Sequence, residues 1–196
     1  MANVLLIGGS GFIGTSLAAQ LLQAGHAVTI PSRNPQQLRA GLHRVPGSQW
    51  IAADVHDAAR LVSLARDCDV VINLVGILHD GDSRSPYGQR FAAAHVELPK
   101  KILAAMKAHS VRRLVHVSAL KAAADAPSGY LRSKAAGEAL LREAVGQFDI
   151  TVLRPSVIFG PGDSFLNTFA TLLKLFPALP LACAGARFQP VYVGDV

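Results

Sequence analysis

Short apolar runs alternate with longer stretches of helical periodicity along most of the chain. Residues 4–7 form an apolar run that ends at Gly8, a pattern typical of a buried strand. Residues 12–24 then place apolar side chains on one helical face, and Gly25 supplies a stop. By the same criteria, strands are predicted at residues 4–7, 26–30, 49–53, 69–74, 113–117 and 150–153.

Helical segments separate these strands, and their order predicts the fold class. They are predicted at residues 12–24, 57–66, 87–109 and 128–145, with a short helix that begins at Pro35. Strands alternating with helices are typical of βαβ units, so we expect an α/β fold with a parallel sheet covered by helices on both faces. Pro99 lies inside the longest helical segment and should kink or break it, because proline has no N–H for the helical hydrogen bond.

The pattern changes after Gly160, where prolines and glycines divide the chain into short pieces. We therefore expect a first domain over residues 1–160, and over residues 161–196 the beginning of a second lobe that covers the substrate. Because no helix follows the last residues, we expect the natural protein to continue beyond Val196.

Composition and charge narrow the function classes. The 196 residues are 51% hydrophobic, yet no apolar run reaches the roughly 18 residues of a membrane span, so no transmembrane segment is expected. The net charge is +6, but the basic residues are scattered, which argues against a nucleic-acid interface. Cys68 and Cys183 are far apart in the sequence and predict reduced thiols in a cytoplasmic protein. The histidines show no metal-ligand spacing, and no metal site is predicted.

A glycine-rich turn directly after the first strand is the clearest functional signal. Residues 9–14 match G-x-G-x-x-G between a predicted strand and a predicted helix, the context in which this motif binds a dinucleotide. The glycines allow backbone amides to approach a pyrophosphate at the helix N-terminus. The expected cradle consists of Gly8, Ser10, Gly11, Phe12, Ile13 and Gly14. The alternative is a glycine-rich turn that binds no ligand. With the alternating elements, the motif predicts a Rossmann-type, doubly wound sheet.

The end of the second predicted strand indicates which dinucleotide is preferred. An NAD site usually has a carboxylate about 20 residues past the glycines, and this chain has Ser32 and Arg33 there. Arg33 can pair with the 2′-phosphate of NADP, helped by the Ser32 hydroxyl. Arg39 and Arg44 are weaker candidates, and Arg33 as an ordinary surface residue is the alternative. We expect NADP to be preferred, with NAD possible.

Three side chains form a candidate catalytic group. Tyr130 and Lys134 lie four residues apart on a predicted helix, so they share one face. A nearby ammonium should lower the tyrosine pKa, as proton exchange with a carbonyl or alcohol requires. Ser118 ends the fifth strand, where it can bond the substrate oxygen. The alternatives are that Tyr130 and Lys134 are incidental surface residues and that Ser118 is an ordinary serine at the end of a strand.

The chain resembles an extended or atypical short-chain dehydrogenase/reductase over essentially its whole length. The segments that carry the resemblance are residues 8–14, 115–120, 128–138 and 153–163. They most resemble one branch, the bacterial relatives of the NAD(P)H-binding accessory subunit of respiratory complex I, which are often described as nucleoside-diphosphate-sugar epimerase-like.

The resemblance implies roles for further residues. It implies that Ser118, Tyr130 and Lys134 are catalytic and that Lys134 also bonds the nicotinamide ribose. It also implies a homodimer face on residues 87–109 and 128–145. Contacts to adenine, adenine ribose and nicotinamide are implied for Asp54, Val55, Leu74, Val75, Gly76, Pro155 and Val157. Many family members have asparagine where this chain has His95. This histidine can carry protons, or it can be a satisfied helix residue.

Two functions of different classes follow. The first is an NAD(P)-dependent oxidoreductase or epimerase-type enzyme that transfers hydride to or from a carbonyl, an alcohol or a nucleotide sugar, on a small-molecule substrate that the sequence does not identify. The second is a non-catalytic NADPH-binding module, or an accessory protein associated peripherally with a respiratory complex. An RNA-binding role for the same fold is disfavoured by the absence of a basic stripe.

Overall fold

A computed structural model describes residues 1–33, 45–81, 85–163, 166–176, 185 and 187–196 of the chain. It contains two compact units, Met1–Arg154 and Pro155–Val196, and each is described by itself. The short helix predicted from Pro35 lies outside the described residues.

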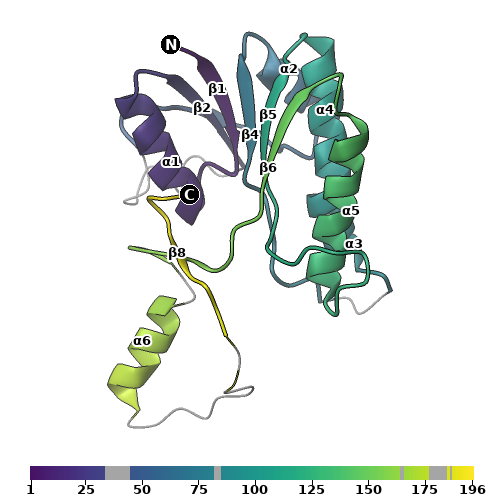
Figure 1. Ribbon diagram of the computed structural model, residues 1–196. Coiled ribbons are helices and arrows are strands. Elements are labelled where there is room, and N and C mark those ends of the chain that lie inside the picture. Colours follow the sequence, from purple (N-terminus) through teal and green to yellow (C-terminus); the bar gives the residue numbers. More distant parts are fainter. Residues whose placement is uncertain (34–44, 82–84, 164–165, 177–184, 186) are drawn as a thin grey trace. The chain divides into compact units, whose positions relative to one another are not determined.

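The first unit contains a parallel sheet of six strands in the order β3-β2-β1-β4-β5-β6 (Figure 1). The strands are β1 (Asn3–Ile7), β2 (Ala27–Ser32), β3 (Gln49–Ala52), β4 (Val70–Asn73), β5 (Arg113–Val117) and β6 (Asp149–Leu153). All six predicted strands are therefore present, with ends that shift by no more than two residues. The strand order runs outward in both directions from β1 and β4, so the predicted doubly wound topology is confirmed.

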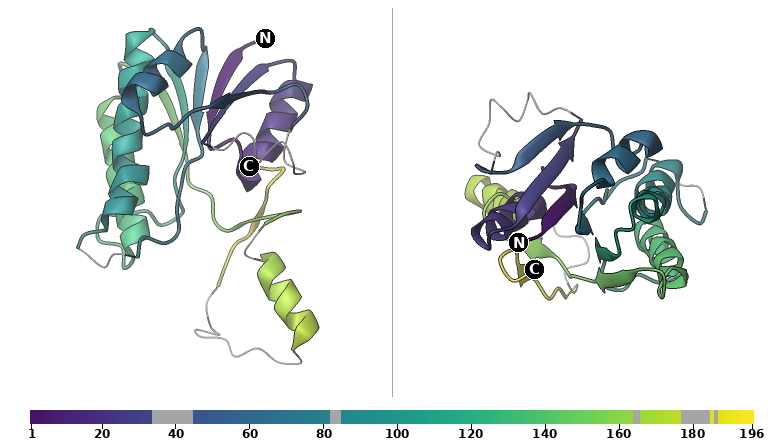
Figure 2. Two further views of the ribbon diagram at one scale, coloured as in Figure 1. Left: turned by 180° about the vertical axis from the view of Figure 1, so that it is seen from behind. Right: turned by 90° about the horizontal axis from the view of Figure 1, so that it is seen from above.

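Helices cover both faces of this sheet, as the views from behind and from above show (Figure 2). On one face, α1 (Phe12–Gln23) packs over a cluster that includes Leu6 and Ile30. The opposite face carries α2 (Ala58–Ala65), α4 (Leu98–Ala108) and α5 (Gly129–Glu143) over a larger apolar cluster. Because both faces are covered, the central strands β1 and β4 have continuous apolar runs, over residues 4–7 and 70–72, rather than an alternating pattern.

The longest predicted helix contains a short turn of π-helix. It runs as α3 (Gln89–Ala92), the π-helix η2 (Ala93–Glu97) and then α4, with Pro99 in the first turn of α4. Proline has no N–H to donate to the carbonyl four residues earlier, which belongs to His95. The interruption expected at Pro99 therefore takes the form of a π-turn, which widens the helix by one residue instead of ending it.

In the part of the second unit that the structure describes, the elements are short. Strands β7 (Ile158–Phe159) and β8 (Val191–Tyr192) pair in parallel, and α6 (Leu166–Leu175) lies between them in the sequence. The Asp163 carboxylate accepts a hydrogen bond of 2.7 Å from the Leu166 amide and so caps α6. Within the described residues, no helix is long and apolar enough to cross a membrane. The expected division into a first domain over residues 1–160 and the beginning of a substrate-covering lobe over residues 161–196 stays a prediction.

Candidate functional site

The carboxyl ends of the strands bring the predicted site residues to one edge of the sheet. All six strands are parallel, so the loops that follow β1 to β5 leave from the same edge. The strand order changes direction between β1 and β4, which are direct neighbours. Ligands of open α/β sheets bind at such a reversal, outside the strand ends.

The turn after β1 has the geometry of a phosphate cradle. Gly8 has φ +86°, and a Cβ there would lie 3.2 Å from the Val75 backbone nitrogen of the loop after β4. At Gly14, a Cβ would lie 2.4 Å from the Cα of Gly9, so only glycine lets α1 approach the turn this closely. The Gly11 amide closes the turn on the Gly8 carbonyl at 3.1 Å.

The N-terminus of α1 is open to an anion. Gly11 is its N-cap residue and supplies no side-chain cap, and the first turn, from Phe12, contains no acidic residue. The free amides and the positive end of the helix dipole therefore face the cradle without an internal competitor. The residues present fit the pyrophosphate of a dinucleotide.

The two segments predicted to bind the adenosine end lie on β2 and β3. Ser32 is the last residue of β2 and is half-buried, and the Arg33 side chain after it is exposed. Asp54 follows β3 and is also exposed, with its carboxylate accepting a 3.0 Å hydrogen bond from the His56 amide. Because β2 and β3 pair directly, these residues leave the same part of the sheet edge. Arg39 and Arg44 lie outside the described residues.

The turn after β4 is held by a buried amide. Asn73 is fully buried, and its Oδ1 accepts a 3.1 Å hydrogen bond from the Val75 amide. Its Nδ2 therefore faces Nδ1 of His116 on β5, at 3.1 Å. This network orients the predicted ribose-lining residues Leu74, Val75 and Gly76 beside the glycine cradle.

Lys134 connects this turn to the end of β5. Its side chain is 3% exposed, and its Nζ donates to the Val75 carbonyl at 3.3 Å and to the Val117 carbonyl at 3.2 Å. A Cβ on Gly76 would lie 3.1 Å from the same Nζ. Burial lowers the pKa of Lys134 to about 8, against an opposing effect of the Glu138 charge. The amine thus lies between the ends of β4 and β5, beside the reversal of the sheet, and its pKa is about 8.

Tyr130 lies one turn before Lys134 and packs against buried aromatic rings. Its ring makes an edge contact with His95, at 5.6 Å between centroids, and with Phe91 at 6.2 Å. Burial raises the pKa of Tyr130 above its ordinary value. The expected lowering of the Tyr130 pKa by the neighbouring ammonium is therefore wrong, because burial of the phenol disfavours its charged form.

Ser118 follows β5 and is buried at 4% exposure. Its amide donates to the Leu153 carbonyl of β6 at 2.8 Å. Among the described residues its hydroxyl has no well-aligned hydrogen bond. It nevertheless lies near enough to the Glu138 carboxylate to help lower the pKa of that carboxyl, so we take this contact as electrostatic.

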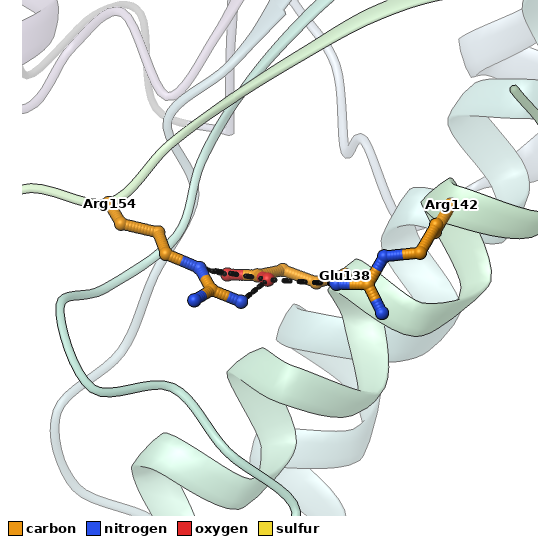
Figure 3. A network of polar contacts seen from close by, with 3 residues as sticks. All are labelled: Glu138, Arg142 and Arg154. Atoms are coloured by element: carbon orange, nitrogen blue, oxygen red, sulfur yellow. Dashed lines mark hydrogen bonds and ion pairs between the residues drawn. The ribbon is translucent and has the colours of Figure 1, made fainter.

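Glu138 forms a network of ion pairs one turn beyond Lys134 (Figure 3). Its carboxylate is 4% exposed, and Arg154 at the end of β6 binds both of its oxygens, with Nε 2.8 Å from Oε1 and 3.0 Å from Oε2. Arg142 approaches it at 4.0 Å. Burial alone would raise the pKa of the Glu138 carboxyl, but the bonds and charges of Arg154 lower it overall. The network ties the helix of Lys134 to the edge strand of the sheet.

His95 is fully enclosed in the π-turn. It is 1% exposed, its Nε2 accepts a 3.1 Å hydrogen bond from the Ile77 amide, and its Nδ1 lies 2.8 Å from the Ser133 hydroxyl. Both ring nitrogens are therefore occupied, as in a satisfied helix histidine.

The structure brings together most of the predicted site. Contacts connect the glycine cradle to the turn after β4, that turn to Lys134, and Lys134 through Val117 to the strand that ends at Ser118. Pro155 and Val157 belong to the second unit, and their place beside nicotinamide stays a prediction. Sequence reasoning missed the supporting residues Asn73, Ser133, Gly137, Glu138 and Arg154. The i, i+4 spacing of Lys134 and Glu138 was one available signal.

Comparison with known proteins identifies the family of the chain. A model of the NAD dependent epimerase/dehydratase family matches residues 4–179. The chain belongs to this family. The resemblance to extended short-chain dehydrogenases, expected from the motifs, is thereby confirmed. Membership in the epimerase/dehydratase family also fits the oxidoreductase-like chemistry expected of the site.

Curated relatives of the chain include a subunit of mitochondrial NADH dehydrogenase. The family member described here is 35% identical, over 97% of its length, to NADH dehydrogenase (ubiquinone) 1 alpha subcomplex subunit 9, a mitochondrial protein of Mus musculus, and it covers 50% of that protein. It thus spans about half the length of the curated relatives it matches. This similarity confirms the expected kinship with the accessory subunit of respiratory complex I.

Solved structures share the fold at lower identity. A UDP-N-acetylglucosamine 4-epimerase from Methanobrevibacter ruminantium M1 superposes with a TM-score of 0.79 at 20% identity, over 99% of this chain and 70% of that one. A UDP-glucose-4-epimerase from Stenotrophomonas maltophila, solved with bound NAD, gives 0.77 at 22% identity, over 100% of this chain and 71% of that one. Both confirm the fold of this epimerase/dehydratase family member.

Proposed function

We propose that the protein is an NAD(P)-dependent oxidoreductase or epimerase-type enzyme that prefers NADP. It transfers hydride to or from a carbonyl, an alcohol or a nucleotide sugar. One observation carries the proposal: the buried Lys134 amine lies between the Val75 and Val117 carbonyls, at the ends of β4 and β5 beside the reversal of the sheet, and one helical turn from Tyr130.

The cradle and the strand ends would hold the cofactor. The turn from Gly8 to Gly11 would cradle the pyrophosphate and the amides of Phe12 to Gly14 would bind it. Leu74 to Gly76 would line the adenine ribose, and Asp54 and Val55 would contact adenine. Pro155 and Val157 would pack on the nicotinamide. When bound, the nicotinamide supplies or accepts the hydride.

The side chains of the chain itself handle the proton. Tyr130 donates its phenol proton to a substrate carbonyl oxygen, or accepts the proton of an alcohol in the reverse direction. A protonated Lys134 stabilises the phenolate and bonds the nicotinamide ribose, and its pKa near 8 makes both protonation states accessible. Ser118 orients the substrate oxygen from the end of β5.

The preference for NADP rests on the end of β2. Arg33 is exposed, and the sequence at the end of β2, Pro31-Ser32-Arg33, contains no carboxylate of the kind that binds the ribose of NAD, so the guanidinium would pair with a 2′-phosphate. NAD stays possible, because the matching family is described as NAD dependent and a structural neighbour was solved with bound NAD.

Turnover by a Tyr130→Phe variant tests the enzymatic role. We expect carbonyl compounds and nucleotide sugars, screened with NADPH, to include a substrate whose turnover the variant loses by at least about a hundredfold, the usual contribution of a general acid. NADPH binding should change little, because the ring remains. Unchanged turnover in the variant contradicts the role of Tyr130.

A second function is favoured by one specific observation, the 35% identity to a subunit of mitochondrial NADH dehydrogenase. On this hypothesis the chain is a non-catalytic NADPH-binding module, or an accessory protein associated with a respiratory complex. Tight NADPH binding without turnover of any screened substrate, together with co-purification with a respiratory complex, would select it. The cytoplasmic location and the homodimer stay predictions in either case.

A further inference from the structure

His95 contacts two segments of the proposed site, the loop after β4 and the helix α5 that carries Tyr130 and Lys134. Its Nε2 accepts the Ile77 amide of the loop after β4 at 3.1 Å, and its Nδ1 lies 2.8 Å from the Ser133 hydroxyl of α5. The Ser133 hydroxyl in turn donates to the Tyr130 carbonyl at 2.8 Å. The ring itself stacks on Phe91 and meets Tyr130 edge-on.

These contacts define the tautomer of the ring. A backbone amide can only donate, so the Nε2 that faces Ile77 carries no proton. The proton of the neutral ring is therefore on Nδ1, which donates to Ser133, and Ser133 passes a donated bond on to Tyr130. Each group in this series, from the Ile77 amide through His95 and Ser133 to the Tyr130 carbonyl, therefore donates its hydrogen to the next.

The surroundings keep the ring neutral. Burial, together with smaller effects of the Lys134 and His116 charges, lowers the pKa of His95 to about 3. Among the described residues, the titratable groups facing the ring are Lys134 and Tyr130 of α5 and His116 of β5. Protonation of Nε2 would also break the bond from Ile77, because two donors would then face each other.

We propose that His95 is a positioning residue that ties the turn after β4 to the helix of Tyr130, and that it carries no proton in the reaction. A proton carrier needs a ring nitrogen that can exchange its partner, and here both nitrogens are held by groups of the protein. The role in the reaction rests on the proposed function, whereas the state of the ring does not.

Histidine ¹⁵N NMR on the full chain without cofactor tests that state. His116 provides an internal control, because the Asn73 amide donates to its Nδ1 and leaves the proton on Nε2, the opposite tautomer. We expect His95 to stay neutral and protonated at Nδ1 from pH 5 to pH 8, with His95→Phe used for assignment. Titration of His95 within this range, or protonation at Nε2, overturns the proposal.

Two substitutions test the positioning. Gln at this position can still accept the Ile77 amide, whereas Phe keeps the ring packing and removes both hydrogen bonds. We expect His95→Phe to weaken NADPH binding about tenfold, and His95→Gln to restore it to within about threefold of the wild type. Equal losses in both variants, with both folded by circular dichroism, contradict the positioning role. If NADPH does not bind the wild-type protein, the proposed function is wrong. The NMR measurement of the tautomer still tests the proposed state of His95 in that case.

Discussion

At the residue scale, the feature with the largest energetic consequence is the burial of Lys134. Its amine is almost fully enclosed, and its pKa falls from the ordinary 10.5 to about 8 because of this burial. At about 1.36 kcal/mol per pKa unit, this corresponds to roughly 3 kcal/mol of preference for the neutral amine in the folded state. A titratable group whose charged form is destabilised this much by burial, and which lies beside the sheet reversal, is typical of a functional site.

Lys134→Met should therefore stabilise the protein while removing its activity. Between pH 8 and 10.5 the unfolded chain holds a proton that folded Lys134 has lost, so this group makes stability rise with pH across that window, and its penalty is largest below pH 8. Loss of the bonds to Val75 and Val117 offsets part of the gain. Urea unfolding at pH 7 should show a variant about 1–2 kcal/mol more stable, without the rise between pH 8 and 10.5.

The control for this experiment is Lys100→Met. Lys100 is half exposed and forms an ion pair with Glu97, three residues earlier, so its effect should stay within about 0.5 kcal/mol. A Lys134→Met variant that is less stable than the wild type at pH 7 and keeps the alkaline rise would contradict the burial argument.

Arg33 carries the prediction of cofactor preference. A charge-assisted hydrogen bond to phosphate contributes about 1.5–3 kcal/mol, so Arg33→Ala should weaken NADPH binding roughly tenfold to a hundredfold and leave NADH binding within about twofold. Fluorescence titration measures both. Arg112→Ala is the matched control, because Arg112 is exposed and precedes β5 at the opposite edge of the sheet. Equal losses for the two cofactors, or no loss, count against an NADP site.

Individual residues were predictable from sequence only where a motif fixed their spacing. The glycine motif and the tyrosine–lysine pair are local, and their residues indeed flank the sheet reversal. Asn73 and Ser133 act across 43 and 38 residues of sequence, and nothing local marks such partners. The raised pKa of Tyr130 also depends on packing by distant rings, which residue spacing does not contain.

At the element scale, the π-turn η2 packs closely against the helix α5 at one glycine, Gly137. A Cβ on Gly137 would lie 2.1 Å from the His95 carbonyl oxygen, so this carbonyl approaches the helix backbone directly. The same carbonyl has lost its helical donor at Pro99. The sequence predicted an interruption at Pro99. It did not predict the π-turn or its close contact with Gly137, because both depend on how two helices pack together.

Gly137→Ala should separate these helices. The added methyl group meets backbone atoms, which cannot turn away as a side chain can, so we expect a loss of about 2–3 kcal/mol in the free energy of unfolding. Gly129→Ala on the same helix is the control. Its Cβ would lie 3.5 Å from the Tyr87 Cβ, an ordinary contact, and alanine is the better helix former. Similar unfolding midpoints for the two variants would show that the close approach is unimportant.

At the scale of the whole molecule, the strand order explains why the site forms where it does. The reversal between β1 and β4 places the glycine turn against the turn after β4, and β5 lies next to β4 with Lys134 above its end. Apolar runs and their alternation with helices were enough to predict this topology, since both faces of a parallel sheet must be buried. The identity of the substrate was not predictable, because it depends on the part of the protein beyond the sheet.

Calorimetric titration of the full chain with NADPH and NADH tests the central claim most directly. If the glycine turn binds a dinucleotide diphosphate beside Tyr130 and Lys134, both titrations should saturate with one site per chain, and NADPH should bind more tightly. The absence of binding by both cofactors at millimolar concentration would contradict the account, whatever the fold.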